Sequence, residues 1–176
     1  MNIKTFLTIG VVVVIGALLL FARASNDASD TTTIDAADTA IYDQAETDVI
    51  TVYKTEACGC CLNWVDHLET NSLDVKLVNV TSTAPTREHF GVPPKLLSCH
   101  TGSINGYWVE GHVPADLVQK LITEKPTDIR GISAPGMPMG SPGMEGPNPV
   151  QYDIVAYHDD GSTSVYATRQ GKEAVE

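Results

Sequence analysis

The chain has 176 residues, with 22 acidic side chains, 11 lysines and arginines, and a formal net charge of −11. This length corresponds to one domain with appendages. The acidic balance argues against nucleic acid as a partner, because its phosphates are bound by basic patches.

An apolar N-terminal segment precedes the rest of the chain. It is uncharged from residue 5 to residue 22, follows Lys4, and ends in the small-x-small pattern Ala22-Arg23-Ala24 that signal peptidase reads. Its length fits both a cleaved signal peptide and a retained membrane anchor, so residues 1–24 are open to both interpretations. Either one predicts that the remaining chain lies outside the cytoplasm. A retained anchor would tether the protein to a membrane through residues 5–22.

Residues 25–48 have the composition of an acidic flexible linker. They contain seven acids, no lysine or arginine, and many serines, threonines and alanines. Such a segment buries too little apolar surface to offset the entropy lost on ordering it. We therefore place the folded domain at residues 49–176.

The domain opens with a strand and a helix. β-branched and aromatic residues predict a strand over residues 49–53. After it, Leu62, Val65 and Leu68 recur at spacings of three, which predicts one apolar face of a helix that ends near Asn71. The two tryptophans, Trp64 and Trp108, are interpreted as packing residues.

A second strand and a second helix follow. The near-continuous apolar run at residues 75–80 predicts a strand that is buried on both faces and paired in parallel. Residues 85–90 predict a short helix, closed by Gly91 in the left-handed conformation.

The remaining elements are a hairpin, a third helix, an irregular loop and another hairpin. Asn105-Gly106 predicts the first hairpin turn and Pro114 the start of the helix. Residues 132–149 are rich in glycine, proline and methionine and are expected to be irregular, before a hairpin of residues 152–157 and 162–168. The sequence therefore predicts an α/β domain, a thioredoxin-like fold in the order βαβαββα, with a C-terminal β-hairpin and a Met/Pro/Gly-rich loop.

Four cysteines carry the main functional signal: Cys58, Cys60, Cys61 and Cys99. Cys58 and Cys61 have C-x-x-C spacing at the start of a helix, where free N–H groups and the helix dipole favour thiolates. Thiolates bind metal ions and also attack disulfides, so the spacing leaves both chemistries open. A third adjacent thiol, Cys60, would scramble a redox pair, and a thioredoxin fold brings the segment around Cys99 beside this helix end. We expect the four sulfurs to converge on a soft metal: copper(I), zinc or an iron–sulfur cluster.

Three methionines favour copper(I) over zinc. Apart from the initiator, every methionine lies in the irregular loop, at Met137, Met139 and Met144. Thioethers are ligands for Cu(I), although these side chains would also serve as an apolar lid over the sheet. Two histidines, His100 and His112, are candidates for metal ligands or for residues that support the ligands.

Two further functions stay open from the residues alone. Cys58 and Cys61 would also suit a thiol–disulfide oxidoreductase that acts on exported proteins. Structural disulfides are the other alternative, although adjacent Cys60 and Cys61 are awkward for unstrained bridges. The sequence contains no Ser-His-Asp order, phosphate-binding glycine loop or H-E-x-x-H motif.

Taken together, these motifs resemble the bacterial CopG-like copper-resistance family. The resemblance covers residues 50–168. It is carried by C-G-C-C at 58–61, V-P-P at 92–94, S-C-H-T at 98–101, E-G-H-V-P at 110–114 and P-G-M-P at 135–138. It implies a thioredoxin-like fold, a periplasmic location and a role in copper resistance.

The resemblance also implies a role for the cysteines. In the family they bridge a cluster of several copper ions, and this role carries over to the matching Cys58, Cys60, Cys61 and Cys99. Interconversion of Cu(I) and Cu(II) would make the protein a copper oxidoreductase, whereas binding and sequestration would equally explain the sequence. The implied partners are copper ions and other exported copper-handling proteins.

Overall fold

The structure is a computed structural model that describes residues 41–42, 46–171 and 173–175. The predicted leader at residues 1–24 and most of the predicted linker lie outside the described residues. In the part of the chain that the structure describes, no helix is long and apolar enough to cross a membrane.

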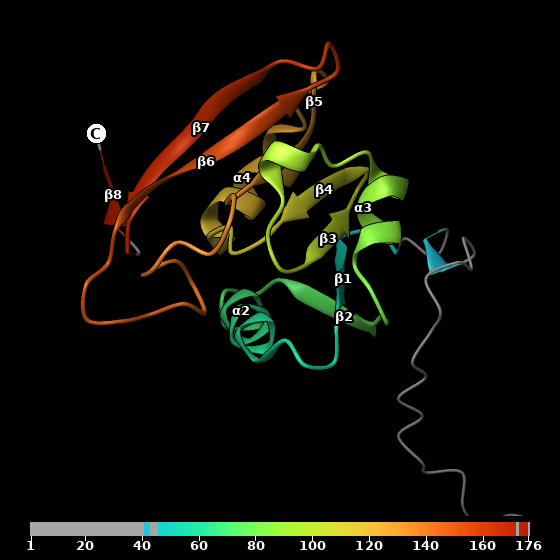
Figure 1. Ribbon diagram of the computed structural model, residues 1–176. Helices are drawn as coiled ribbons and strands as arrows, with labels where there is room; N and C mark the ends of the chain where they lie inside the picture. The colour runs from blue at the N-terminus through green and yellow to red at the C-terminus, as the bar shows by residue number, and fades with distance from the viewer. Residues whose placement is uncertain (1–40, 43–45, 172, 176) are drawn as a thin grey trace, which may run out of the picture. The chain divides into compact units, whose positions relative to one another are not determined.

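One mixed sheet of eight strands organises the described chain, in the order β2-β1-β3-β4-β5-β6-β7-β8 (Figure 1). The strands are β1 (Val49–Lys54), β2 (Asp74–Asn79), β3 (Thr101–Ile104), β4 (Tyr107–Glu110), β5 (Ile129–Ser133), β6 (Gln151–His158), β7 (Thr163–Gln170) and β8 (Glu173–Ala174). The helices are α2 (Gly59–Thr70), α3 (Ala84–Phe90) and α4 (Ala115–Glu124), with a 3-10 turn η3 (Pro94–Leu96). The predicted mixed α/β class is confirmed.

The first four strands place the cysteine segments side by side. β1 and β2 are parallel neighbours, with α2 in the connection between them, and β3 lies antiparallel to β1 on its other side. β3 and β4 form the predicted hairpin, because Asn105 and Gly106 adopt positive φ angles of 49° and 87°. The start of α2 follows β1, and the segment with Cys99 leads into β3, so two neighbouring antiparallel strands bring them to the same end of the sheet.

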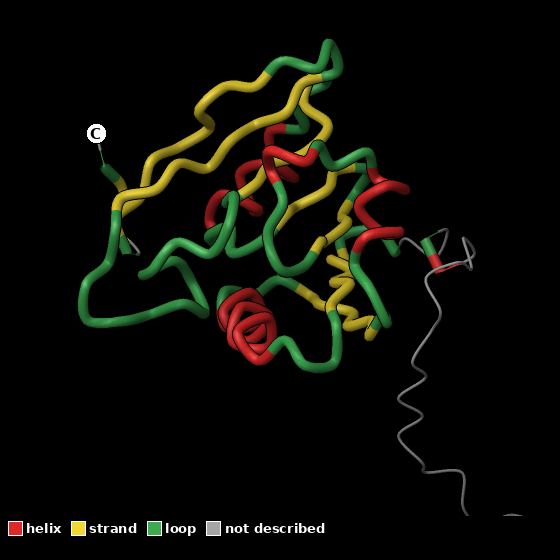
Figure 2. The backbone as a smooth tube through the Cα atoms, viewed as in Figure 1, coloured by secondary structure: helices red, strands yellow, loops and turns green. Residues whose placement is uncertain are grey.

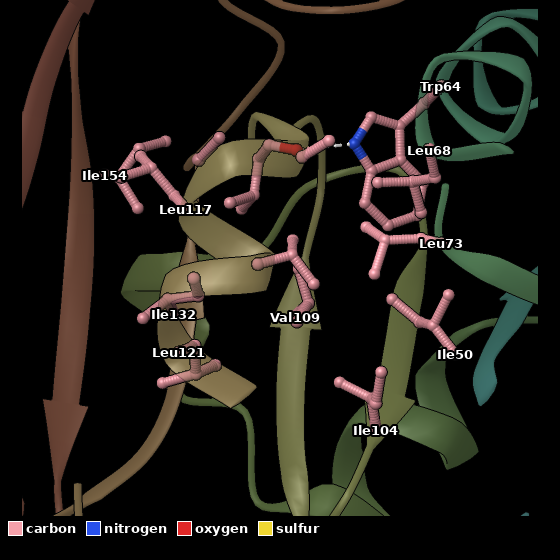
Figure 3. Close-up of a cluster of buried hydrophobic side chains, with 14 of the residues drawn as sticks. Ile50, Trp64, Leu68, Leu73, Ile104, Val109, Leu117, Leu121, Ile132 and Ile154 are labelled. Carbon is pink, nitrogen blue, oxygen red and sulfur yellow. Dashed lines mark hydrogen bonds between the residues drawn. The ribbon is translucent and has the colours of Figure 1, made fainter. Parts of the chain in front are cut away.

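Side chains of β1 alternate between two clusters of buried residues. Ile50 and Val52 of β1 belong to the main core, whereas Tyr53 packs with Val80 in a second cluster. The main core also contains Trp64 of α2 and residues of α4, so both helices cover the same face of the sheet (Figure 3). The Trp64 indole donates a hydrogen bond of 2.8 Å to the carbonyl of Val113, which is drawn in Figure 3.

Two predictions about burial are wrong. β2 is paired in parallel as expected, but it is an edge strand and Leu77 is 40% exposed, so it is not buried on both faces. On α2, Leu62 is 48% exposed, and Trp64 lies in the core with Val65 and Leu68. A spacing of three therefore located the helix but misplaced its apolar face by part of a turn.

The boundary of the glycine- and proline-rich segment is also corrected. Ile132 and Ser133, expected to be irregular, end strand β5, which pairs with β4 in parallel and with β6 in antiparallel fashion. Gly131 permits this strand, because a Cβ atom there would collide with the ring of Trp108.

The loop that links β5 to β6 is irregular from residue 134 to residue 150, as predicted. It passes beside α2 before the chain enters β6 (Figure 2). Gly143 lies directly against the first turns of the helix, where a Cβ atom would come 2.8 Å from the backbone nitrogen of Trp64. The predicted C-terminal hairpin is confirmed as β6 and β7, and it extends the same sheet.

Candidate metal centre

Three of the cysteines lie at the N-terminal end of α2. Cys58 immediately precedes the helix and makes no side-chain cap bond, while Cys60 and Cys61 belong to the first turn. Backbone N–H groups in a first turn have no acceptor within the helix, so this end favours anionic sulfur. Cys58 and Cys61 are joined by a disulfide, with Cα atoms 5.4 Å apart, whereas Cys60 and Cys99 are free thiols.

Cys99 approaches this helix end from the segment between η3 and β3. Its Sγ atom lies 3.7 Å from that of Cys61, and the Sγ atoms of Cys58 and Cys60 are also 3.7 Å apart. All four sulfur atoms lie within 4.8 Å of one another. The structure thus brings together the four cysteines expected in one site, and metal binding by them stays a prediction.

Two buried histidines extend the cluster on the side of Cys99. The Sγ atom of Cys99 lies 3.2 Å from Nδ1 of His100 and 3.1 Å from Nε2 of His112. Both imidazoles have no exposed surface, and the ring of Trp64 lies 4.3 Å from that of His100. Cys99, His100 and His112 thus form a second group of converging ligand atoms, which shares Cys99 with the four-sulfur group.

The glycine- and methionine-rich loop fixes the orientation of one imidazole. Nδ1 of His112 lies 2.7 Å from the carbonyl oxygen of Pro142. A carbonyl oxygen only accepts hydrogen bonds, so Nδ1 carries the proton and donates it. Nε2 of His112 then presents its lone pair towards Cys99, which is the tautomer that a metal ligand needs.

Burial sets the protonation states of this site. It raises the pKa of the Cys99 thiol to about 12, with a further rise from the nearby Cys60 thiol. Burial also lowers the pKa of His100 well below its usual range and lowers that of His112. Without metal, the site therefore holds a protonated Cys99 beside neutral imidazoles. A metal ion that binds Cys99 must displace its proton.

The histidines predict a pH dependence of stability in the metal-free protein. Below pH 6.5, the ordinary pKa of histidine, the unfolded chain protonates His100 and His112 while the folded chain keeps them neutral. The unfolded state then binds more protons, so the free energy of unfolding falls as the pH decreases through this window. The slope is at most about 1.4 kcal/mol per pH unit for each histidine.

Urea unfolding at several pH values from about pH 7.5 to about pH 5, a range that spans the ordinary histidine pKa of 6.5, would measure this slope. His100→Asn should flatten it, because the variant retains only His112 as a buried imidazole at the site. An equal slope in the variant and the wild type would contradict the assignment to His100.

A buried carboxylate holds the segment that carries Cys99. Oε1 of Glu110 accepts hydrogen bonds from Nε of Arg87 at 3.1 Å and from the backbone nitrogen of Ser98 at 2.7 Å. Oε2 accepts one from the Thr101 hydroxyl at 2.6 Å. Arg87 also donates to the carbonyl of Ser98. The residues on both sides of Cys99 and His100 are therefore tied to one carboxylate.

Several residues of this site were missed in the sequence. Arg87, Ser98, Glu110 and Pro142 had no predicted role, although Ser98 and Glu110 stand inside the quoted motifs. Glu110 was detectable in principle, because a charged residue ends an otherwise apolar strand. Arg87 and Pro142 carry no such local signal.

The three methionines occupy different environments. Met137 is 56% exposed and lies near Cys99, with which it lines a small pocket. Met139 is 43% exposed, and its sulfur packs against Gly146 of the same loop. Met144 is partly buried, and its backbone closes turns with Gly140 and Ser141. As ligands, all three stay predictions.

The fold and the site define a class of protein. It is a mixed α/β protein in which four cysteines and two histidines form a cluster able to hold a metal ion. Its ligand set of thiols and imidazoles suits soft and borderline metals.

Comparisons with known proteins narrow this class. A family model described as "Protein of unknown function, DUF411" matches residues 96–144, which contain Cys99, both histidines and all three loop methionines. No curated protein sequence matches the chain. A solved structure titled "Copper resistance protein copG- Form 2" is 41% identical with a TM-score of 0.66, and the match covers 70% of this chain and 99% of that one. A second, titled "Copper resistance protein copG- Form 1", has the same identity and TM-score and is matched over 72% of this chain and 100% of that one.

The chain therefore belongs to the CopG family. The predicted family resemblance is confirmed.

Proposed function

We propose that this protein is exported, acts in copper resistance, and holds Cu(I) as a cluster of several ions bridged by Cys58, Cys60, Cys61 and Cys99. The observation that carries the proposal is the shared position of Cys99, which belongs to both the four-sulfur group and the group with His100 and His112. A thiolate can bridge two metal ions. Two ligand groups with one sulfur in common therefore suit a cluster better than a single isolated ion.

The ligand types support copper. Thiolate and thioether sulfur select Cu(I), and imidazole is a ligand of both copper oxidation states. Zinc would be satisfied by four of these ligands in a closed tetrahedron, which would leave two of the six converging side chains without a role. The titles of the two matched structures name copper resistance, which agrees with this preference.

Copper binding by all four cysteines depends on the redox state of Cys58 and Cys61. The Cys58–Cys61 disulfide must gain two electrons, which convert it into two thiolates, before all four sulfurs can serve as thiolate ligands. Several copper ions that share bridging sulfurs can distribute the loss of electrons among them. We therefore include interconversion of Cu(I) and Cu(II) in the proposal, as an activity additional to binding.

The proposal extends to fold family and location. The sheet order β2-β1-β3-β4, with β1 and β2 parallel and α4 after β4, supports a thioredoxin-like core followed by added strands. The apolar segment at residues 5–22 supports export to the periplasm, as a free or a membrane-tethered protein. Its partners would then be copper ions and other exported copper-handling proteins.

Anaerobic titration of the reduced, full-length protein with Cu(I) tests the proposal. We expect more than one tightly bound copper per chain in the wild type. Cys99→Ser should reduce uptake to at most one ion, because it removes the sulfur that joins the two ligand groups. A chelator of known affinity reports the bound copper, and circular dichroism checks that the variant is folded. Uptake that is unchanged in Cys99→Ser would contradict the shared site.

A second candidate function is thiol–disulfide exchange, and the Cys58–Cys61 disulfide at the start of α2 favours it. An oxidoreductase would reduce or oxidise protein disulfides, and its activity would survive Cys60→Ser. A copper cluster would instead lose bound copper in this variant. A disulfide that resists reduction, together with no copper uptake by the wild type, would favour a purely structural role for the cysteines.

A further inference from the structure

A small pocket opens beside the candidate cluster. Its volume is about 170 Å³, and it is lined by Leu97, Ser98, Cys99, Gly136 and Met137. Cys99 is the member of the cluster shared by both ligand groups. The pocket is therefore lined by the residue that the two ligand groups share.

Met137 lines this pocket, and the residue is 56% exposed. Its position is fixed by the backbone of its neighbour, because the Gly136 nitrogen donates a 2.9 Å hydrogen bond to the carbonyl of Leu97. The hydroxyl of Ser98 donates to the carbonyl of Gly136 from the other side. An apolar side chain thus remains in water although the loop that carries it is tied to the Cys99 segment.

The neighbouring methionine provides a contrast. Met139 is exposed to a similar degree, at 43%, but its sulfur packs against Gly146 and it does not line the pocket. Exposure in this loop is therefore not what distinguishes Met137. The distinguishing feature of Met137 is that it lines the same pocket as Cys99.

We infer that Met137 and Cys99 form a transfer site through which Cu(I) enters the cluster from a donor that holds the ion through weak, neutral ligands such as thioethers. This inference rests on the proposed function. A thioether is a soft ligand without charge, so it can bind Cu(I) at the surface without holding it tightly. An exposed thiolate would bind more tightly but would also be open to oxidation.

The transfer is a ligand exchange without change of oxidation state. The sulfur of Met137 first binds Cu(I) while the ion is still attached to its donor. Sγ of Cys99 then forms a bond to copper, its S–H bond breaks, and the proton passes to water. The bonds between copper and the donor break, and the thioether of Met137 is released once the cluster sulfurs have taken the ion.

Transfer kinetics test this inference in the reduced, full-length protein. The probe is Cu(I) bound to bicinchoninate, whose colour disappears when the ion moves to the protein in an anaerobic stopped-flow experiment. Met137→Leu, which nearly conserves volume, should slow the transfer about tenfold and leave the final copper content unchanged. Met139→Leu is the matched control, because it removes a thioether of similar exposure from the same loop, 43% against 56%. This variant should take up copper at the wild-type rate.

The outcomes separate the two proposals. If the wild type takes up no copper, the proposed function fails. If the wild type takes up copper and Met137→Leu transfers as fast as Met139→Leu, only the transfer site is overturned. A lower final copper content in Met137→Leu would also overturn it, because Met137 would then be a permanent ligand. Circular dichroism of both variants checks that the fold is intact.

Discussion

Arg87→Met should lower the free energy of unfolding by about 3–5 kcal/mol, because it leaves the carboxylate of Glu110 buried without its cation. The Glu110 side chain has no exposed surface and that of Arg87 is 17% exposed. Methionine preserves most of the aliphatic packing but neither the ion pair nor the hydrogen bond to the Ser98 carbonyl. Urea unfolding of the metal-free protein at pH 7 measures the loss.

The loss should depend on pH in a defined direction. Burial raises the pKa of Glu110 above its ordinary 4.5, and the donors Thr101, Ser98 and Arg87 oppose this rise. Removal of the Arg87 cation takes away one of these opposing effects, so the pKa of Glu110 rises further in the variant. An acid whose folded pKa is raised binds more protons when folded, so stability falls as the pH rises from 4.5 through that pKa. The deficit of Arg87→Met should therefore shrink as the pH is lowered towards 4.5.

The chain offers a matched control for this ion pair. Nη2 of Arg169 lies 2.7 Å from Oδ2 of Asp116, whose side chain is 63% exposed. Arg169→Met leaves this carboxylate in water, so the free energy of unfolding should fall by at most about 1 kcal/mol. Equal losses in the two arginine variants would contradict the argument from burial. The double variant Arg87→Met/Glu110→Gln should recover part of the loss, since no buried charge remains.

Arg87→Met should also weaken the metal site. Glu110 holds the backbone of Ser98 and the hydroxyl of Thr101, and these residues flank Cys99 and His100. Without Arg87 this segment loses the hydrogen bond to the Ser98 carbonyl, and Glu110 loses the cation that holds it. We expect Cu(I) affinity to fall by about tenfold or more, the range found when residues that orient metal ligands are replaced. Arg169→Met, whose ion pair lies outside this network, should bind copper as the wild type does.

The cysteine cluster was predictable from the sequence because it depends on short motifs and on the order of the strands. The C-G-C-C run follows β1, and the segment around Cys99 precedes β3. A parallel β1-α2-β2 unit beside an antiparallel β3 brings them together whatever the details of packing. The hairpin at Asn105-Gly106 was equally local, since its turn depends on two residues that tolerate positive φ.

Other parts depend on tertiary contacts that a single sequence does not encode locally. β5 exists because Gly131 leaves room for the ring of Trp108, so the composition of the segment was a poor guide to its structure. Arg87 and Glu110 are 23 residues apart, and their pairing depends on how α3 packs against the sheet. Met137 and Met139 are alike in sequence, and they differ only in which backbone and side chains surround them.

The largest effect expected from the methionine loop is that of Gly143→Ala. Gly143 has a φ of +82°, and a Cβ atom there would lie 2.8 Å from the Trp64 nitrogen and 2.9 Å from the Cys60 carbonyl oxygen. These are backbone atoms of α2, which cannot rotate away as a side chain could. Strain at positive φ and the clash should together lower the free energy of unfolding by about 2–4 kcal/mol.

Gly136→Ala separates backbone strain from the clash. Gly136 lies in the same loop with a φ of +72°, but a Cβ atom there would meet nothing within 4 Å. This variant should lose only about 1 kcal/mol, the cost of alanine in the left-handed conformation. The difference between the two variants in urea unfolding therefore measures how tightly the loop is docked on α2. Equal losses would show that the close approach of Gly143 to the helix is not required.

Gly143→Ala should also release His112 from its orientation. Pro142, the residue before Gly143, accepts the Nδ1 proton of His112, so a loop displaced from α2 takes this carbonyl away. The imidazole would then be free to change tautomer and would no longer hold its Nε2 lone pair towards Cys99. Nitrogen-15 NMR of the imidazole reports the tautomer directly, and copper affinity should fall about tenfold. A wild-type histidine signal in a destabilised Gly143→Ala protein would mean that the loop stabilises the fold without orienting the candidate ligand.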